Sequence, residues 1–427
     1  MKRLDSISRS PIYSMFSETL SGASTIRAYA AEPRFIAENL RRTDRNHAAY
    51  VYMYGANRWF SSRIALIAGI VILVAALGAV RMRDSLGAGM AGLTLTWVMS
   101  FADYLNWIVR VHSNLEMSMN AVERVDEYSE IPQEAAAVVE SNPPPSNWPS
   151  KGALTVCNLE MRYASDLPPV LQNVSFALNG GEKLGIVGRT GAGKSSLSLA
   201  LFRIVEASKG AIHIDGLDIS KMGLHDLRSR MTIIPQDPVL FEGTVRNNLD
   251  PFGQYDDTAI WSSLHDVKFM DSLQSHKFVA PLQLSHRSSD LTLNANEVEW
   301  SGFGLDSPVA EGGTNFSQGQ RQLLCLTRAL LKSSTVTVLD EATASIDSET
   351  DANIQQVIRG PSFANTTVLS IAHRLRTVID YDKILVLDKG CVVQFGPPAE
   401  LIRVNGVFRT MCMETGEFEE LCILAGK

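Results

Sequence analysis

The sequence predicts a chain in two parts: an all-α membrane region, then an α/β domain with a largely buried sheet. Three observations support this fold class. Residues 64–80 are uncharged and apolar, and residues 141–150 (SNPPPSNWPS) form a proline-rich linker that no helix can continue through. After the linker, strand-like and helix-like runs alternate to the C-terminus. With 427 residues, the chain is long enough for two or three domains.

The composition excludes several classes of protein. A formal net charge of −7 argues against a surface that neutralises phosphates, so we expect no nucleic-acid partner. Five cysteines without a C-x-x-C pair indicate a reducing compartment rather than a disulfide framework or a zinc site. Cys157 and Cys325 lie in apolar runs and are expected in the core. The opening, MKRLDSISRSPIY, lacks the apolar stretch of a signal peptide and starts in polar helix-like sequence, as if cut from a longer chain.

The N-terminal part reads as helices, two of which we expect to cross a membrane. The segment IALIAGIVILVAALGAV, residues 64–80, spans ~25 Å as a helix, slightly short of a hydrocarbon slab of ~30 Å. Arg63 and Arg81 can snorkel to make up the difference. Residues 85–102 are uncharged and rich in small residues, which suits packing inside a membrane bundle. The alternative is a pair of buried helices in a soluble protein, which the length criterion disfavours.

The most specific motif is IVGRTGAGKS, residues 186–195. An apolar strand runs straight into the spacing G-x-x-x-x-G-K-S, and a helix-like segment follows. Glycines let successive backbone N–H groups converge on a phosphate at the helix N-terminus. We expect the Lys194 side chain to reach the β and γ phosphates and the Ser195 hydroxyl to bind Mg²⁺. The predicted ATP-binding residues of the loop are Gly188, Arg189, Thr190, Gly191, Ala192, Gly193, Lys194, Ser195 and Ser196.

A second apolar strand, TVTVLD, residues 335–340, ends in a carboxylate and is followed by another. At the C-terminal edge of a sheet, Asp340 would lie beside the nucleotide crevice and hold Mg²⁺, directly or through water. Glu341 is placed to polarise the water that attacks the γ phosphate. Two adjacent acids can also simply begin a helix, but their combination with a phosphate loop favours the catalytic interpretation.

Three further segments make the pattern specific. NFSQGQRQLLCLTRALL, residues 315–331, resembles the signature motif of ATP-binding cassette (ABC) proteins, which normally reads LSGGQ. IIPQDPVLFEGTVRNNLDPF, residues 233–252, resembles their Q-loop region, and SIAHRL, residues 370–375, resembles their switch region. The resemblance implies a P-loop NTPase fold, an ABC cassette with a mixed sheet core and a helical subdomain.

The same resemblance implies roles for single residues. Gln236 would be the Q-loop glutamine, with a part in catalysis and in Mg²⁺ binding. His373 would contact the γ phosphate, and Asp347 would belong to the D-loop ASID. Tyr163 stands where the family stacks an aromatic ring on adenine.

The chain is most similar in pattern to the C-type, or multidrug-resistance-associated, exporters. SPIYSMFSETLSGASTIRAY, residues 10–29, resembles their second-half intracellular loop, whose short coupling helix docks on an ATPase domain. Residues 104–128 resemble the end of their last membrane helix. The resemblance covers nearly the whole chain except residues 272–302, which we interpret as a surface insertion. It implies the C-terminal part of a transporter, with the last two membrane helices and the second nucleotide-binding domain.

These inferences predict four segments. They are a cytoplasmic helical extension with the coupling loop (1–57), two transmembrane helices at about 62–80 and 85–105 (within 58–110), a helix and proline-rich linker (111–150), and the ABC nucleotide-binding domain (151–427).

In this family two cassettes enclose two ATP molecules, and each site joins the phosphate loop of one cassette to the signature of the other. The residues expected to face the partner's site are Ser317, Gln318, Gly319, Gln320 and Asp347. Gln318 replaces the usual glycine, so a long side chain stands where backbone would approach phosphate. We therefore expect hydrolysis at the site built on Lys194, and slow or absent turnover at the site completed by Ser317.

The sequence thus predicts the ATP-hydrolysing portion of an exporter of organic anions, conjugates or drugs, with ATP and Mg²⁺ as cofactors. Its expected partners are the first half of the transporter, the lipid bilayer and a small-molecule substrate. The expected location is a plasma or vacuolar/lysosomal membrane, with the cassette on the cytosolic side. The alternatives are a nucleotide-gated channel or regulatory subunit, an inactive truncated fragment, and a soluble cassette protein of repair or translation. Residues 64–80 and the acidic balance argue against the last.

Overall fold

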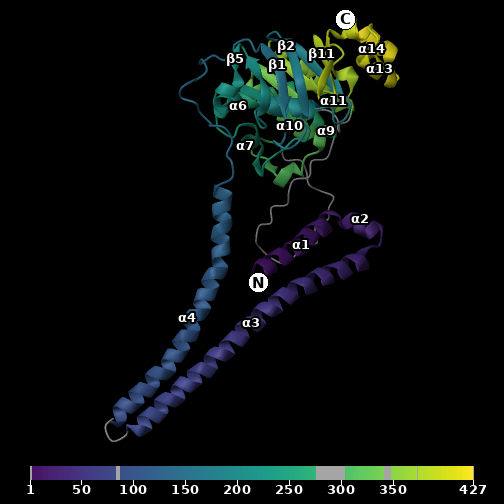
Figure 1. The fold of residues 1–427 in the computed structure, drawn as a ribbon. Coiled ribbons are helices and arrows are strands. Elements are labelled where there is room, and N and C mark those ends of the chain that lie inside the picture. Colours follow the sequence, from purple (N-terminus) through teal and green to yellow (C-terminus); the bar gives the residue numbers. More distant parts are fainter. Residues whose placement is uncertain (1, 83–86, 276–302, 341–347, 373, 427) are drawn as a thin grey trace. The chain divides into compact units, whose positions relative to one another are not determined.

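The computed structural model describes residues 2–82, 87–275, 303–340, 348–372 and 374–426. The chain divides into two compact units, Met1–Gln133 and Glu134–Lys427. The first unit is helical and the second is α/β (Figure 1). This confirms the predicted fold class, a helical fragment followed by a cassette with a mixed sheet.

The first unit contains α1 (Lys2–Ser21), α2 (Ala23–Ala28), α3 (Glu32–Arg81) and α4 (Ala88–Ser129). Proline stands in the first turn of α3, where its missing N–H group costs no helical hydrogen bond. Helix α1 lies along α3, because Asn46 Nδ2 donates to Asp5 Oδ1 at 3.0 Å and to Ser8 Oγ at 2.9 Å. The predicted extension, residues 1–57, thus comprises α1, α2 and the first half of α3, and the first apolar segment, residues 64–80, continues α3 without a break.

Of the helices in the described ranges, α3 is long and apolar enough to cross a membrane. None of its apolar window is buried within the chain, as expected for a helix that faces lipid. Helix α4 begins with a shorter apolar stretch, Ala88–Phe101. Helices α3 and α4 run antiparallel and lie close together near their connected ends (Figure 1).

The centre of the second unit is a six-stranded sheet with the order β12-β11-β3-β10-β9-β6, in which β12 alone is antiparallel to its neighbour. The strands of this sheet are β3 (Lys183–Gly188), β6 (Met231–Ile234), β9 (Val336–Asp340), β10 (Thr367–Ile371), β11 (Lys383–Asp388) and β12 (Cys391–Gly396). Residues of the central strands, such as Val338 and Leu369, are fully buried. Covered parallel sheets need apolar residues on both faces, which explains the continuous apolar runs in the sequence.

Smaller sheets accompany this core. A four-stranded antiparallel sheet has the order β2-β1-β4-β5, and β7 pairs with β8. Their bounds are β1 (Leu154–Met161), β2 (Leu171–Leu178), β4 (Ala207–Ile214), β5 (Leu217–Asp218), β7 (Gly243–Thr244) and β8 (Pro308–Val309).

The helices of the second unit fall into groups. Helices α7 to α10 contribute Val245, Ile260, Phe269 and Leu324 to a second apolar core, in agreement with the expected helical subdomain. This core also includes Leu339 and Val368 of the central sheet. Helix α9 takes up the first residues of the predicted insertion, and residues 276–302 lie outside the described residues. The helix bounds are α5 (Lys194–Leu201), α6 (Leu224–Arg230), α7 (Val245–Leu249), α8 (Asp257–Asp266), α9 (Phe269–Ser275), α10 (Gln318–Lys332), α11 (Ser348–Arg359), α12 (Pro398–Leu401), α13 (Val407–Glu414) and α14 (Phe418–Ala425).

The proline-rich linker groups with the sheet domain, because the second unit begins at Glu134. The Arg228 guanidinium donates to both carboxylate oxygens of Glu134, at 2.7 and 3.1 Å. Further along, the buried Trp148 donates from Nε1 to Ile214 O at 2.9 Å. The boundary differs from the expected residue 151 because side-chain contacts, which composition does not reveal, tie the linker to the domain.

The prediction that Cys157 lies in the core is wrong. Cys157 is exposed, because residues along β1 alternate between the two faces of the sheet and Cys157 falls on the outer one. Cys325 is buried in α10, as expected.

Asp215 holds the end of the linker. It follows β4 with a φ of +50°, and its carboxylate accepts hydrogen bonds from the backbone N–H groups of Ser150, Lys151, Gly152 and Ala153. Burial by itself would raise the pKa of Asp215. The four donors outweigh this effect and hold its pKa below the ordinary value of 3.8.

We predict that Asp215→Asn lowers the free energy of unfolding at pH 7 by about 1–2 kcal/mol, a modest value because the site is partly solvated. Asparagine tolerates the positive φ, so the change removes the charge and one acceptor oxygen without straining the backbone. Because the pKa is lower in the folded state, the stabilisation is present above pH ~4 and is lost as the pH falls through the folded pKa. Chemical denaturation between pH 3 and 7 measures this, with the exposed Asp166→Asn as control. A difference that does not change with pH would contradict the role.

Candidate functional site

The loop between β3 and α5 has the strand–loop–helix geometry that its glycine spacing predicts. Gly193, just before the helix, has a φ of +95°, and a Cβ atom there would lie 2.8 Å from Leu171 Cδ2. A Cβ atom at Gly188 would collide with the carbonyl oxygen of Leu387. Only glycine fits both positions, so the backbone can turn its N–H groups toward the start of α5.

Lys194 is the first residue of α5 and is only 6% exposed. Its Nζ donates to the carbonyl oxygens of Gly188 at 2.9 Å and Arg189 at 3.2 Å. The ammonium group therefore lies within the loop, beside the positive end of the helix dipole. An ammonium with three rotatable donors suits the oxygens of a phosphate chain.

The neighbouring hydroxyl faces a carboxylate from another strand. Ser195 Oγ donates to Asp340 Oδ1 at 3.3 Å. The register of the sheet explains this contact, since Ile371 of β10 pairs with Asp340 on one side and with Ile186 on the other. The C-terminal ends of β3 and β9 therefore lie at one edge of the sheet, as the sequence predicted.

Ser198 is a residue of this site that the motif did not identify. It is 1% exposed, and its Oγ lies 2.7 Å from Ser195 O and 3.5 Å from Asp340 Oδ2. The available signal was its position three residues after Ser195, on the same face of α5.

The aromatic ring expected at the adenine lies beside this helix. Tyr163 follows β1, is 51% exposed, and its hydroxyl is 2.9 Å from Ser196 Oγ. The structure thus brings Tyr163 to the phosphate-loop helix and leaves about half of the residue exposed.

The signature residues form the N-terminus of α10. Ser317 is the N-cap of a capping box, in which Gln320 N–H donates to Ser317 Oγ at 3.2 Å and Ser317 N–H donates to Gln320 Oε1 at 2.9 Å. Gln318 and Gly319, half-buried, occupy the first turn. The capping box fixes the first turn of this 15-residue helix, and the positive end of the helix dipole there favours an anion nearby.

The other predicted catalytic residues divide into two groups. Gln236 follows β6 and is exposed. Glu341, Asp347 and His373 lie outside the described residues, although β9 ends immediately before the first and β10 ends two residues before the last. Their roles stay predictions.

Comparison with known proteins adds independent evidence. Residues 171–344 match the family model described as ABC transporter, and residues 1–109 match the ABC transporter transmembrane region. The chain belongs to the ABC transporter family. The match to the transmembrane region also makes it a membrane protein, and its cassette is an ATP-binding domain.

Similar ABC transporters include fungal and mammalian proteins. The chain is 47% identical to a pleiotropic ABC efflux transporter of multiple drugs from Candida glabrata, over 100% of this chain and 26% of that protein. It is 47% identical to an ATP-dependent bile acid permease from Saccharomyces cerevisiae, over 100% of this chain and 25% of that protein. It is 48% identical to human ATP-binding cassette sub-family C member 3, over 97% of this chain and 26% of that protein. The chain therefore spans about a quarter of the length of the curated relatives it matches.

The site of this ABC cassette fits Mg·ATP. The Ser195 hydroxyl and the Asp340 carboxylate are the hard oxygen ligands that Mg²⁺ prefers. Within the described ranges, no cluster of three His, Cys, Asp or Glu side chains could hold a metal ion. Mg²⁺ commonly takes one or two protein oxygens and keeps waters and phosphate oxygens as its other ligands, so this pair of side chains fits it.

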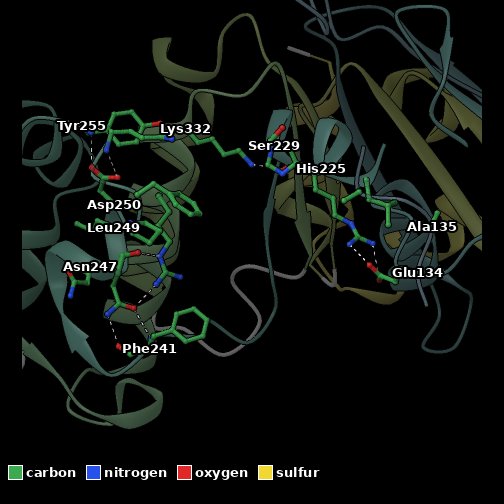
Figure 2. A pocket seen from close by; sticks show the side chains of 18 residues that line it. Glu134, Ala135, His225, Ser229, Phe241, Asn247, Leu249, Asp250, Tyr255 and Lys332 are labelled. Atoms are coloured by element: carbon green, nitrogen blue, oxygen red, sulfur yellow. Dashed lines mark hydrogen bonds and ion pairs between the residues drawn. The ribbon is translucent and has the colours of Figure 1, made fainter. Parts of the chain in front are cut away.

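The ABC cassette also carries a groove of about 1040 Å³, lined by α6, α7, the C-terminal part of α10 and residues 134–137 (Figure 2). Phe241 and Phe252 contribute rings that are 70% and 81% exposed. Charged groups at its margin, such as Arg228, are paired within the cassette. An open groove with large exposed aromatic rings is typical of a surface that binds another protein element.

We predict that Lys194→Ala lowers the affinity of the chain for Mg·ATP by at least about 100-fold. The variant lacks the buried ammonium group that would bind the negatively charged phosphates. Titration of the purified chain with a fluorescent ATP analogue measures this. Lys209→Ala, which removes an exposed lysine paired with Glu160, is the matched control and should bind as the parent does. Equal affinity in Lys194→Ala and the parent would contradict the assignment of the phosphate loop.

Proposed function

We propose that the chain is the ATP-hydrolysing, membrane-coupled portion of a C-type ABC exporter. The observation that carries the proposal is the Ser195–Asp340 contact beside a buried Lys194, in a chain whose N-terminal unit matches a transmembrane region. The names of the relatives, a multidrug efflux transporter and a bile acid permease, support organic anions, conjugates or drugs as the exported substrates.

The residues of the chain divide the chemical work. Lys194 and the loop N–H groups bind the phosphate chain. Ser195 and Asp340 would hold the metal ion, which would offset negative charge on the phosphates. Glu341 accepts a hydrogen bond from the attacking water and orients it toward the γ phosphate. Gln236 contributes to the metal site, and His373 donates to the γ phosphate. Hydrolysis in this scheme depends on positioning and electrostatics.

A second cassette completes each site in the proposed assembly. The signature helix, with Ser317 at its cap, would face the ATP of the other cassette, and the signature of that cassette would close over Lys194. Gln318 in the first turn of α10 weakens the former site, since its side chain occupies space near the helix N-terminus. The chain is therefore active only together with the first half of the transporter.

Coupling to the membrane uses the groove of the cassette. The exposed rings of Phe241 and Phe252 and the groove volume support docking of a short helix from the membrane domain. Closure of the two cassettes around ATP would move this helix, and the membrane helices would alternate their access between the two faces. The cassette would lie in the cytosol, at a plasma or vacuolar/lysosomal membrane.

A nucleotide-gated channel or regulatory subunit is the second candidate, because the same family architecture serves such proteins. A carboxylate at residue 341 favours the pump, since gating by binding alone does not require activation of water.

One experiment tests the proposal and the inequality of the two sites. We predict that the complete transporter in inside-out vesicles accumulates an organic anion conjugate when ATP is added. Glu341→Gln should abolish this uptake and lower ATP hydrolysis at least about 100-fold, because a general base contributes 10²–10⁴ in rate. Glu400→Gln, an exposed glutamate, is the control. Residual hydrolysis near half the parent rate would contradict unequal sites, and ATP-dependent current without uptake would favour the channel.

A further inference from the structure

The signature helix α10 holds the segment that carries Gln236. Gln322 lies two residues beyond the signature glutamine Gln320 and is 1% exposed. Its Nε2 donates to the carbonyl oxygen of Pro235 at 3.3 Å. Pro235 directly follows β6 and directly precedes Gln236. A side chain of α10 therefore fixes the backbone at the point where the strand passes into the segment that carries Gln236.

A second contact from α10 holds the other side of the same segment. Arg328 Nη1 donates to Val239 O at 2.9 Å, and Arg328 Nη2 donates to Asn248 Oδ1 at 2.8 Å. Asn248 in turn accepts from the backbone N–H of Phe241 at 2.8 Å. Gln236 is exposed between these two attachments. Two attachments to α10 therefore flank Gln236 in the sequence, one at Pro235 and one at Val239.

Stability alone does not explain a glutamine at position 322. Its Oε1 is buried and has no hydrogen-bond partner in the part of the chain that the structure describes. A buried polar atom without a partner destabilises the folded state, and an apolar side chain of similar length would avoid this cost. Methionine has a side chain of similar length but no N–H group, so it could not donate a hydrogen bond to Pro235.

We propose that Gln322 is a positioning residue for Gln236. Its amide fixes Pro235, so that the Gln236 side chain keeps its geometry toward the metal ion of the bound nucleotide and moves together with the signature helix. The inference rests on the proposed function, in which Gln236 contributes to the magnesium site. It adds a direct connection, through one hydrogen bond, between the signature helix of one ATP site and the metal site of the other.

The test uses Gln322→Met in the complete transporter, because methionine keeps the length of the side chain and removes the donor. We expect the Mg²⁺ concentration for half-maximal ATP hydrolysis to rise about 3- to 10-fold, the range that corresponds to the loss of one hydrogen bond. The KM for ATP at saturating Mg²⁺ should change less than twofold. The melting temperature should change little, because methionine removes an unpaired buried oxygen and also leaves the Pro235 carbonyl without this donor. Hydrogen exchange should become faster in peptides that cover residues 233–239. Gln322→Leu, a second variant without a donor, should give the same shifts.

Thr327→Val is the matched control, since Thr327 is fully buried on the same helix and its Oγ1 donates within α10, to Leu323 O at 2.8 Å. It should change the melting temperature and leave the Mg²⁺ requirement unchanged. An unchanged Mg²⁺ requirement in active Gln322→Met, or an equal rise in Thr327→Val, would overturn the positioning role. If the parent transporter itself does not hydrolyse ATP, the proposed function is overturned. Hydrogen exchange then decides the further inference by itself: equal exchange in residues 233–239 of Gln322→Met and the parent would show that Gln322 does not fix Pro235.

Discussion

The contact between Ser195 and Asp340 is the constraint on which the rest of the cassette depends. Ser195 is the second residue of α5 and Asp340 is the last residue of β9, and they meet because β3 and β9 flank β10 in the same register. In a parallel sheet the C-terminal ends of the strands lie at the same edge. Both faces of such a sheet are covered, so its central strands need apolar residues on both faces. The long apolar runs of the sequence and the position of the metal-binding oxygens therefore have a common cause.

Around this contact, hydrogen bonds within the cassette fix the polar side chains. Lys194 is buried, yet its ammonium is satisfied by carbonyl oxygens of the loop, and Ser198 braces both Ser195 and Asp340 from the second turn of α5. Ser317 and Gln320 form a capping box at the N-terminus of the signature helix. Rigid donors fixed before a phosphate arrives need no reorganisation on binding, which is the general condition for electrostatic catalysis.

Much of this was available from the sequence, for identifiable reasons. The phosphate loop could be predicted because only glycine fits the backbone at certain positions, which gives the sequence a fixed glycine spacing. Asp340 could be predicted because it ends an apolar run. Contacts between distant segments could not be predicted. The linker belongs to the cassette through Glu134 and Asp215, and Gln322 reaches Pro235 across 87 positions of the chain. Cys157 was misassigned because an apolar run does not say which face of an antiparallel strand a residue occupies.

The most direct test of the account is the contribution of Mg²⁺ to nucleotide binding in Asp340→Asn. Calorimetric titration of the chain with ATP, in Mg²⁺ and in EDTA, gives the gain in affinity that the metal provides. The account predicts that the parent shows a clear gain, and that Asp340→Asn reduces it by about 10- to 100-fold while metal-free ATP still binds. If Asp340→Asn kept the full gain from Mg²⁺, the carboxylate at the end of β9 would not hold the metal, and the proposed site would be contradicted.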